Sequence, residues 1–177
     1  CSGSTDRVNL ENAQAQFLGL STNAQTGYAV DNDGDYNNDG IDDLLFGATR
    51  ESTVNGTQSG AAYVVYGPVS GSSSLNSANG TLLGESATDY AGRSVDGCDI
   101  DGDGLDDVLV GAWGNDSYRP DGGAVFVYYS PLSSSSPVAD AMMYGANDND
   151  AAGWSIACAG DVNNDGFEDV LVGSPKN

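Results

Sequence analysis

Short apolar runs, separated by turns rich in glycine, asparagine and aspartate, dominate the pattern of this chain. The runs at 44–47 (LLFG), 108–111 (VLVG) and 170–173 (VLVG) are continuous, which is typical of strands buried on both faces. A second group, at 61–67 (AAYVVYG) and 124–129 (AVFVYY), is rich in β-branched and aromatic residues, which favour strands. Long helical periodicity is absent, as is any apolar run of about 18 residues that could span a membrane. The pattern therefore predicts an all-β protein.

The strands belong to an internal repeat. Gly19, Gly84 and Gly145 occupy equivalent positions, which gives a period of 61 to 65 residues. Four strands are expected in each repeat. The first ends at Val30, Val95 or Ile156, and the two groups of apolar runs described above are the second and third strands. The fourth lies at 81–85 (TLLGE) or 142–146 (MMYGA), with a counterpart at 16–20 (QFLGL). Four antiparallel strands per repeat with glycine-rich turns predict β-propeller blades, here an incomplete propeller of about three blades. A β-sandwich fits less well, because sandwich strands do not recur at this period.

The same alignment divides the chain. Residues 1–14 form an N-terminal segment, 15–79 the first repeat, 80–139 the second, and 140–177 a third, partial repeat. The Ser-rich segments within the first two repeats, 70–80 and 130–140, are expected to be mobile loops that face solvent.

An acidic phrase follows the first strand of each repeat, and its copies begin at Asp35, Asp99 and Asp161, 64 and 62 residues apart. Oxygen ligands at positions 1, 3, 5 and 9 of such a loop, with glycine at position 6, suit calcium, and the residue at position 7 offers its carbonyl. The expected ligands are Asp35, Asn37, Asp39, Ile41 and Asp43; Asp99, Asp101, Asp103, Leu105 and Asp107; and Asp161, Asn163, Asp165, Phe167 and Asp169, where Ile41, Leu105 and Phe167 bind through the backbone. Without a cation, so many neighbouring carboxylates would repel one another. Three occurrences argue against simple Asp-Gly turns.

The loop is not an EF-hand, because an apolar residue stands at position 12 and a strand follows it in place of a helix. Since the protein ligands fill the site, the metal is expected to be structural and to tie the first two strands together. We expect the side chains at position 8, which are Asp42, Asp106 and Glu168, to point outward. Asp31 and Asp33 are interpreted as a solvated turn rather than as further ligands.

Composition excludes several function classes. The chain has 26 acidic and 5 basic residues, a net charge of -21, and no histidine. Such a chain repels nucleic acid and anionic lipid, so neither is expected as a partner. The absence of histidine removes a Ser-His-Asp triad and most zinc sites. Because catalytic sites are seldom triplicated, three nearly identical acidic loops also argue against an enzyme.

The three cysteines are Cys1, Cys98 and Cys158. Cys98 and Cys158 occupy nearly the same point of successive repeats, and two interpretations stay open: a disulfide between neighbouring units, or two small buried thiols. Cys1 opens the chain as Cys-Ser-Gly-Ser, which resembles the mature end of a bacterial lipoprotein with a lipidated cysteine. An arbitrary starting point of the sequence would look the same. A lipid on Cys1 would be the only expected membrane contact.

Together, a Gly-x-x-Val strand, a D-x-[DN]-x-D-G-x-x-D loop, an L-V-G-A strand and a G-x-V-F-V-Y strand resemble the FG-GAP repeat, which builds the β-propeller of integrin α-subunits and occurs in many bacterial surface proteins. The resemblance covers roughly residues 15–177. The chain departs from it in detail: Gly27-Tyr28, Gly92-Arg93 and Gly153-Trp154 stand where the family often has Phe-Gly. The resemblance implies about three calcium ions and a non-catalytic extracellular or cell-surface role in adhesion, ligand display or assembly. It does not give a ligand.

Family propellers close with about seven blades, and this chain carries fewer than three. Its last blade lacks two strands, whereas 16–20 and Val8-Asn-Leu10 offer spare strands at the other end. We therefore expect head-to-tail self-assembly into a ring or a filament, in which one copy completes the last blade of the next. The alternative is a fragment of a longer propeller that binds a protein or a carbohydrate. For a carbohydrate, Trp113, Tyr118 and Trp154 are candidate stacking residues, although packing between blades is the commoner role of such residues.

Overall fold

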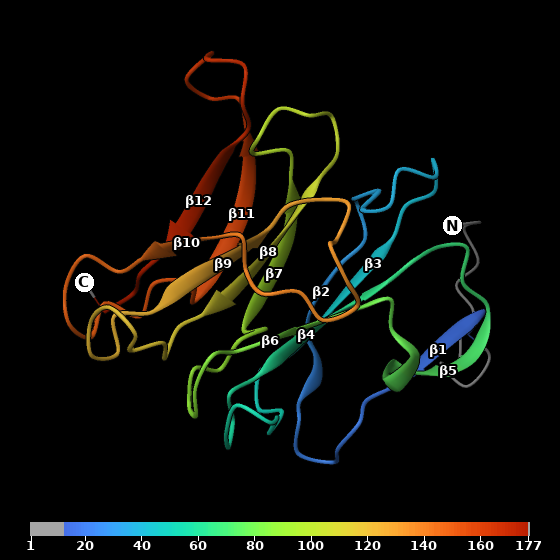
Figure 1. The fold of residues 1–177 in the computed structure, drawn as a ribbon, viewed down its shortest axis with the longest axis horizontal. Helices are drawn as coiled ribbons and strands as arrows, with labels where there is room; N and C mark the ends of the chain where they lie inside the picture. Colours follow the sequence, from blue (N-terminus) through green and yellow to red (C-terminus); the bar gives the residue numbers. More distant parts are fainter. Residues whose placement is uncertain (1–12, 177) are drawn as a thin grey trace, which may run out of the picture.

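The computed structural model describes residues 13–176, which fold into short strands joined by long turns (Figure 1). The strands are β1 (Ala15–Leu18), β2 (Thr26–Asp31), β3 (Leu44–Ala48), β4 (Ala61–Val65), β5 (Gly71–Ser74), β6 (Gly80–Leu83), β7 (Ser94–Cys98), β8 (Asp107–Ala112), β9 (Ala124–Tyr128), β10 (Ala141–Tyr144), β11 (Ser155–Gly160) and β12 (Asp169–Gly173). The only helical element of residues 13–176 is a 3-10 turn, η2 (Leu75–Ser77). Nothing in this part of the chain is therefore a helix that could cross a bilayer.

Three antiparallel sheets repeat the same order of strands. The first blade has the order β2-β3-β4-β6, the second β7-β8-β9-β10, and the third consists of β11 and β12. Each of the two full blades is a meander whose neighbours in sequence are neighbours in the sheet, apart from the insertion of β5 before β6. The prediction of an all-β fold with antiparallel four-stranded blades is confirmed. The sheets are offset by one strand from the sequence repeats: β6 opens the second repeat in the sequence but is the last strand of the first blade.

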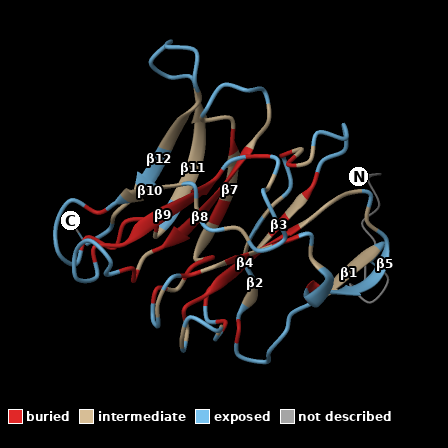
Figure 2. Ribbon diagram, in the orientation of Figure 1, coloured by how far each residue is buried: buried red, intermediate tan, exposed pale blue. Residues whose placement is uncertain are grey.

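The blades stack face to face, with their first strands β2, β7 and β11 side by side (Figure 1). Leu45, Val64 and Leu82 of the first blade pack in one buried cluster with Val110 and Phe126 of the second. This face-to-face burial explains why β8 and β9 are apolar at consecutive positions: both strands are buried along their whole length, with a blade on either side (Figure 2).

A second inter-blade cluster joins the second blade to the third. Leu109, Val125 and Val127 lie on the opposite face of the second blade from the first cluster, and Ile156 and Val170 pack against them. The side chains of β8 and β9 therefore alternate between two interfaces.

The glycine of the L-V-G-A strand marks a close approach between blades. A Cβ atom on Gly47 would overlap the carbonyl oxygen of Gly92, and one on Gly111 would overlap that of Gly153. The backbone of the next blade thus crosses directly over this position. Only glycine leaves room for it.

The first strands begin later than the sequence suggested in two repeats. Val95 and Ile156 were expected to end a strand, but each is the second residue of one, in β7 and β11. Gly92 and Gly153 have φ of 79° and 78°, and Gly27 has the same left-handed backbone at 80°. In the first repeat Thr26 still pairs with Ala48 across a register shift, so β2 starts before this turn, whereas β7 and β11 start after it. In the first repeat, Val30 is the penultimate residue of β2, as expected.

The segment 70–80 is not simply a solvent-facing loop. It contains β5, which pairs in parallel with β1, and the fully buried side chain of Leu75. Together these cover the outer face of the first blade, where Phe17 packs against Phe46 with ring centres 4.9 Å apart. The strand at 16–20, predicted to be the outer strand of a blade, is thus held by its own chain as β1. Val8-Asn-Leu10 and Cys1 lie outside the described residues.

Candidate metal-binding loops

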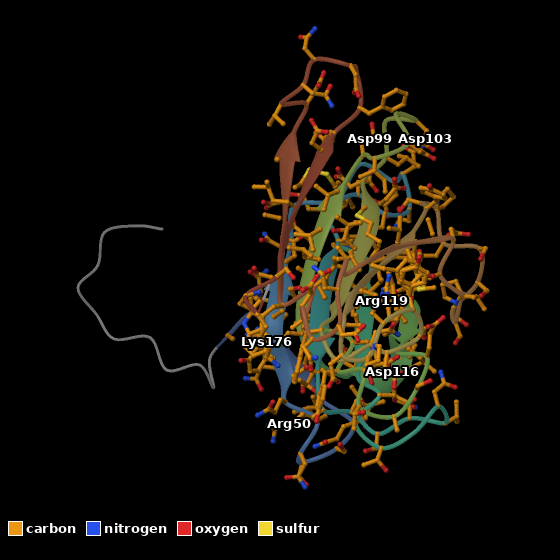
Figure 3. All side chains as sticks on the ribbon, turned by 90° about the vertical axis from the view of Figure 1, so that its left-hand side faces the viewer. Arg50, Asp99, Asp103, Asp116, Arg119 and Lys176 are labelled. Carbon is orange, nitrogen blue, oxygen red and sulfur yellow. A yellow bond between two sulfur atoms is a disulfide. The ribbon has the colours of Figure 1, made fainter. Side chains whose placement is uncertain are left out.

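The three acidic loops connect the first two strands of each blade and emerge at the same end of the stack (Figure 1). In the second loop, ligand oxygens of Asp99, Asp101 and Asp107 all lie within 4.8 Å of one another. Figure 3 places Asp99 and Asp103 together at this end. The structure therefore brings positions 1, 3 and 9 of the second loop to one point. Among the described residues, the predicted aspartate ligands of the first and third loops do not converge this closely.

The carboxylate at position 1 organises each loop. Asp35 accepts hydrogen bonds from the backbone N–H groups of Asp39 (3.0 Å) and Gly40 (2.7 Å). Asp99 accepts them from the N–H groups of Gly102 and Gly104, and Asp161 from those of Asp165 and Gly166. Desolvation, the largest single influence, raises the pKa of Asp35, but the hydrogen bonds from backbone N–H groups of the loop together outweigh it and lower this pKa. The loop thus holds this group in the charged form that a cation requires.

The glycine at position 6 has the predicted left-handed backbone. The φ angles of Gly40, Gly104 and Gly166 are 82°, 90° and 95°. Next to it, the carboxylate at position 5 accepts the N–H of position 7 in each loop, as Asp39 does from Ile41 at 2.9 Å. The phrase therefore folds the same way three times.

The aspartate at position 9 has a second task that the sequence did not indicate. Asp43 accepts the N–H of Tyr36 within the loop (3.0 Å) and the N–H of Gly67 beyond β4 (2.8 Å). Asp107 does the same with Ile100 (3.2 Å) and Ser130 (3.0 Å). Both aspartates are fully buried. Position 9 therefore links the loop to the third strand of its own blade.

Burial perturbs these carboxyl groups. Desolvation, with the negative charges of Asp101 and Asp103 behind it, raises the pKa of Asp107 to about 6. Burial likewise raises the pKa of Asp43. In the first loop, Oδ1 of Asn37 is buried and has no hydrogen-bond partner. A hard cation would bind such an oxygen that lacks a hydrogen-bond partner and would neutralise the neighbouring carboxylates, so the residues present fit calcium.

Comparison with known proteins supplies the family. A family model described as "FG-GAP repeat" matches residues 26–65, 91–128 and 152–177, more than half of the chain. This chain belongs to the FG-GAP repeat family. Each matched stretch contains one acidic loop and its flanking strands, and in the two full blades it ends with the third strand. The FG-GAP repeat implies that the stacked sheets are arranged as the blades of a β-propeller.

Several integrin α chains are similar to this one. Integrin alpha-3 of Mus musculus is 36% identical over 95 residues, which is 53% of this chain and 9% of the relative. Integrin alpha-4 of Xenopus laevis is 34% identical over 138 residues (76% and 12%), and integrin alpha-PS5 of Drosophila melanogaster is 32% identical over 165 residues (84% and 14%). The chain thus spans about a tenth of the length of these relatives.

Neighbouring FG-GAP repeats are linked beside the loops. Cys98 and Cys158 form a disulfide, which is one of the two alternatives left open by the sequence. Because the two sulfurs are bonded to each other, their proximity to Glu168 is not a thiolate metal site. The N–H of Cys158 also donates to Asp96 of the preceding blade at 2.9 Å.

Position 8 behaves differently from the expectation of an outward side chain. Glu168 is half-buried and accepts the N–H of Asp99, in the preceding loop, at 3.0 Å. Asp106 is also half-buried, and burial, followed by the charges of Glu168 and Asp99, raises its pKa. Only Asp42 is exposed. Position 8 therefore faces the loop of the preceding blade, a relation that only the stacking of blades creates.

Asp31 and Asp33, which precede the first loop, have different surroundings. Asp33 is exposed, as expected of a solvated turn. Asp31 is half-buried and accepts a hydrogen bond from the hydroxyl of Tyr36 at 3.2 Å. Burial and the nearby charge of Asp96 raise the pKa of Asp31. This aspartate lies between blades and is not simply solvated.

Proposed function

We propose that this chain is a calcium-binding, non-catalytic part of an extracellular β-propeller with an adhesive or assembly role. The observation that carries the proposal is the convergence of Asp99, Asp101 and Asp107 within 4.8 Å in the second loop, whose hydrogen bonds at positions 1 and 5 recur in the other two loops. The expected sites are the fifteen residues of positions 1, 3, 5, 7 and 9, and about three ions. The disulfide fits an oxidising compartment and therefore an extracellular setting.

Bound calcium would supply positive charge to each crowded loop. The chain's own residues do the rest: position 1 closes the loop by accepting N–H groups, and position 9 fixes the loop to the third strand. Since this set of protein ligands would fill the coordination sites of the ion, we expect the loop to tie β7 to β8, and their counterparts to each other, in a structural role. The same near-complete ligand set, repeated in each blade, supports a non-catalytic role.

Thermal unfolding in 10 mM calcium and in EDTA tests the proposal. For dissociation constants near 10⁻³ M, each site stabilises the fold by about 1.4 kcal/mol at this concentration, so three sites raise the Tm by roughly 10 °C. Titration calorimetry should give about three ions per chain. An EDTA-treated protein with an unchanged Tm and no saturable heat of binding would refute it.

A matched pair of variants assigns the effect to a loop. Asp103→Asn removes one ligand charge but keeps an oxygen that can accept the N–H of Leu105. Asp116→Asn removes the same charge from an exposed turn after β8 (Figure 3). We expect Asp103→Asn to lose one calcium ion and about a third of the calcium-dependent rise in Tm, and Asp116→Asn to lose neither. Equal behaviour of the two variants would point to non-specific screening of charge.

The third blade supports a second proposal, about partners. It has two strands where the other blades have four, and Leu171 and Val172 of β12 are exposed to 62% and 36% (Figure 2). An open apolar edge favours pairing with further strands. In a longer propeller, the following residues would supply them and the whole would bind a protein or carbohydrate ligand. Integrin α chains, which are far longer, favour this completion.

Head-to-tail completion by another copy is the other possibility that we propose to test. It needs strands at the N-terminal end, and β1 already pairs with β5 of its own chain, so β1 would have to be released. Native mass spectrometry in calcium distinguishes the two completions. Rings or filaments of the 18.0 kDa chain support self-assembly, and a stable monomer at micromolar concentration rules it out.

A further inference from the structure

A hollow of about 270 Å³ opens at the start of the first strands, at the opposite end from the acidic loops. It is lined chiefly by four aromatic and two basic residues: Tyr28, Arg50, Tyr90, Arg93, Trp113 and Trp154. We call it the aromatic groove. Tyr28, Arg93 and Trp154 are equivalent in the three repeats, because each follows the glycine at the beginning of the first strand. The stacking of blades therefore brings one residue of each repeat to the same place.

The rings of the groove form a continuous row. Tyr90 stacks on Trp113 with ring centres 4.8 Å apart and an interplanar angle of 8°. Trp113 in turn contacts Trp154, with centres 5.1 Å apart and an angle of 60°. Trp113 and Trp154 are the only two tryptophans of the chain. The guanidinium of Arg93, which lies over both Trp154 and Tyr28, joins Tyr28 to this row. Tyr28 is 50% exposed, so part of this apolar surface is open to a ligand.

Arg93 lies in the middle of the row without a partner of opposite charge. Its guanidinium carbon is 4.7 Å from the centre of the Tyr28 ring and 4.5 Å from that of Trp154. Among residues 13–176, no carboxylate pairs with this group and it donates no side-chain hydrogen bond. Rings on its faces hold a guanidinium in place, and its N–H edge is the part that binds carboxylates in a bidentate manner.

Basic side chains gather around the groove, at an end of the molecule that also carries acidic residues such as Glu51 and Asp116. Of the four basic residues among residues 13–176, Arg50 and Arg93 line the groove and Lys176 lies over the ring of Trp113 at 4.8 Å. Figure 3 shows Arg50 and Lys176 in the half of the molecule away from Asp99 and Asp103. Arg93 and Asp99 are six residue steps apart, which is about 20 Å along an extended strand. That is roughly two Debye lengths at physiological ionic strength, so the acidic loops do not cancel the attraction for an anion.

We propose that the aromatic groove binds a saccharide that carries a carboxylate. The C–H face of a pyranose ring covers the exposed part of Tyr28, and its carboxylate meets the N–H edge of Arg93. An acidic side chain of a peptide would satisfy the arginine but would leave the exposed ring of Tyr28 uncovered. The groove is separate from the calcium loops, so failure of this proposal leaves the calcium proposal intact.

Tryptophan fluorescence reports this site alone, because both tryptophans lie in it. The folded protein in calcium is titrated with sialyllactose and with lactose, which lacks the carboxylated sugar. We expect saturable quenching by sialyllactose, at least tenfold weaker binding of lactose, and weaker binding of sialyllactose as salt is raised. Equal affinities for the two sugars, or no fluorescence change up to 20 mM (roughly the weak limit of specific binding), would overturn the proposal.

Two arginine variants provide a matched comparison. Arg93→Gln should weaken binding of sialyllactose at least tenfold and leave lactose unchanged. Arg119 is the control, because it also lies over a ring, that of Tyr118 at 5.5 Å, but outside the groove. Arg119→Gln should bind as the unmodified chain does. If Arg93→Gln unfolds, Arg50→Gln, which alters an exposed side chain, should still weaken sialyllactose binding about threefold.

An acidic pentapeptide completes the experiment. We expect it to bind at least tenfold more weakly than sialyllactose. Tighter binding of the peptide, lost in Arg93→Gln, would assign the groove to a protein ligand and would overturn the saccharide assignment. Equal affinity of Arg93→Gln and the unmodified chain for sialyllactose would equally overturn it, because the arginine would then take no part.

Discussion

The residue at position 2 of each acidic loop can pack between neighbouring blades, and we predict that its contribution to stability depends on how far it is buried. Tyr36 in the first loop is fully buried between the first two blades, and its hydroxyl donates to Asp31 at 3.2 Å. It also lies against Gly97 of β7, where a Cβ would collide with the hydroxyl. Val162, at the same position of the third loop, is 71% exposed because no described strand of a further blade covers it. The same loop position is therefore buried between blades in one repeat and exposed to solvent in another.

The magnitude follows from this difference in burial. Replacement of a buried aromatic side chain by alanine costs about 3–5 kcal/mol, so Tyr36→Ala should remove roughly a fifth or more of a typical domain's total stability of about 5–15 kcal/mol. Tyr36→Phe keeps the packing and loses one hydrogen bond to a half-buried carboxylate, for about 1 kcal/mol. Val162→Ala should change the free energy of unfolding by less than about 0.5 kcal/mol.

Urea unfolding followed by far-UV circular dichroism, in saturating calcium and again in EDTA, measures all three variants. The slope of the unfolding free energy against urea should stay constant while the midpoint moves. The loss of unfolding free energy should decrease in the order Tyr36→Ala, Tyr36→Phe, Val162→Ala in both conditions, since the packing does not depend on the ion. A loss below 1 kcal/mol for Tyr36→Ala, or equal losses for Tyr36→Ala and Val162→Ala, would refute the role of Tyr36 as a contact between blades.

Three further perturbations have definite expected outcomes. The Cys98–Cys158 disulfide closes a loop with a sequence separation of 60, so its replacement by two serines should cost about 4 kcal/mol of unfolding free energy, measured under non-reducing conditions. The pKa of Asp107 in the metal-free fold is about 6, which is above its unfolded value, so protonation should stabilise the metal-free protein as the pH falls from 6 towards 4. Because calcium competes with this proton, the calcium affinity of the second loop should drop about tenfold at pH 5. Calorimetry that shows no loss of affinity at pH 5 would contradict this. Gly111→Ala should lower the free energy of unfolding by about 2–3 kcal/mol, because the new methyl group meets the carbonyl of Gly153; an unchanged Tm would show that the blades can separate there.

Much of this fold could be predicted because the information is local. Turn glycines, ligand spacing and apolar runs act within a few residues, and the sequence carries three copies of them. The left-handed backbone of Gly40, Gly104 and Gly166 is one example, since position 6 needs a sharp bend in any copy. The apolar runs of β3 and β8 are another, because a strand covered on both faces needs no polar side.

The features that could not be predicted from the sequence depend on contacts between distant parts of the chain. Glu168 looked like a solvated acid, and only the stacking of blades brings it to the N–H of Asp99. Leu75 lay in a Ser-rich stretch of low apolar content, yet it is buried because the outer face of the first blade needs a cover. The sequence singled out Trp113 and Trp154 as candidate stacking residues, together with Tyr118, which lies outside the aromatic groove. It did not show the groove itself, because Tyr28, Arg93 and Trp154 are far apart in the sequence.

The aspartate at position 9 connects calcium binding to the completion of a blade. Asp43 and Asp107 each accept an N–H from beyond the third strand, which holds the carboxylate in place before a cation arrives. Among the described residues, the carboxylate of Asp169 accepts hydrogen bonds only from Val162 and Asn163 of its own loop. The third loop is therefore the least pre-organised, and we expect it to have the weakest calcium affinity of the three. By linkage, any strand that completes the third blade and donates an N–H to Asp169 should raise that affinity, and calcium should tighten the binding of that strand by the same factor. A three-site titration in which Asp165→Asn removes the strongest site would contradict this order.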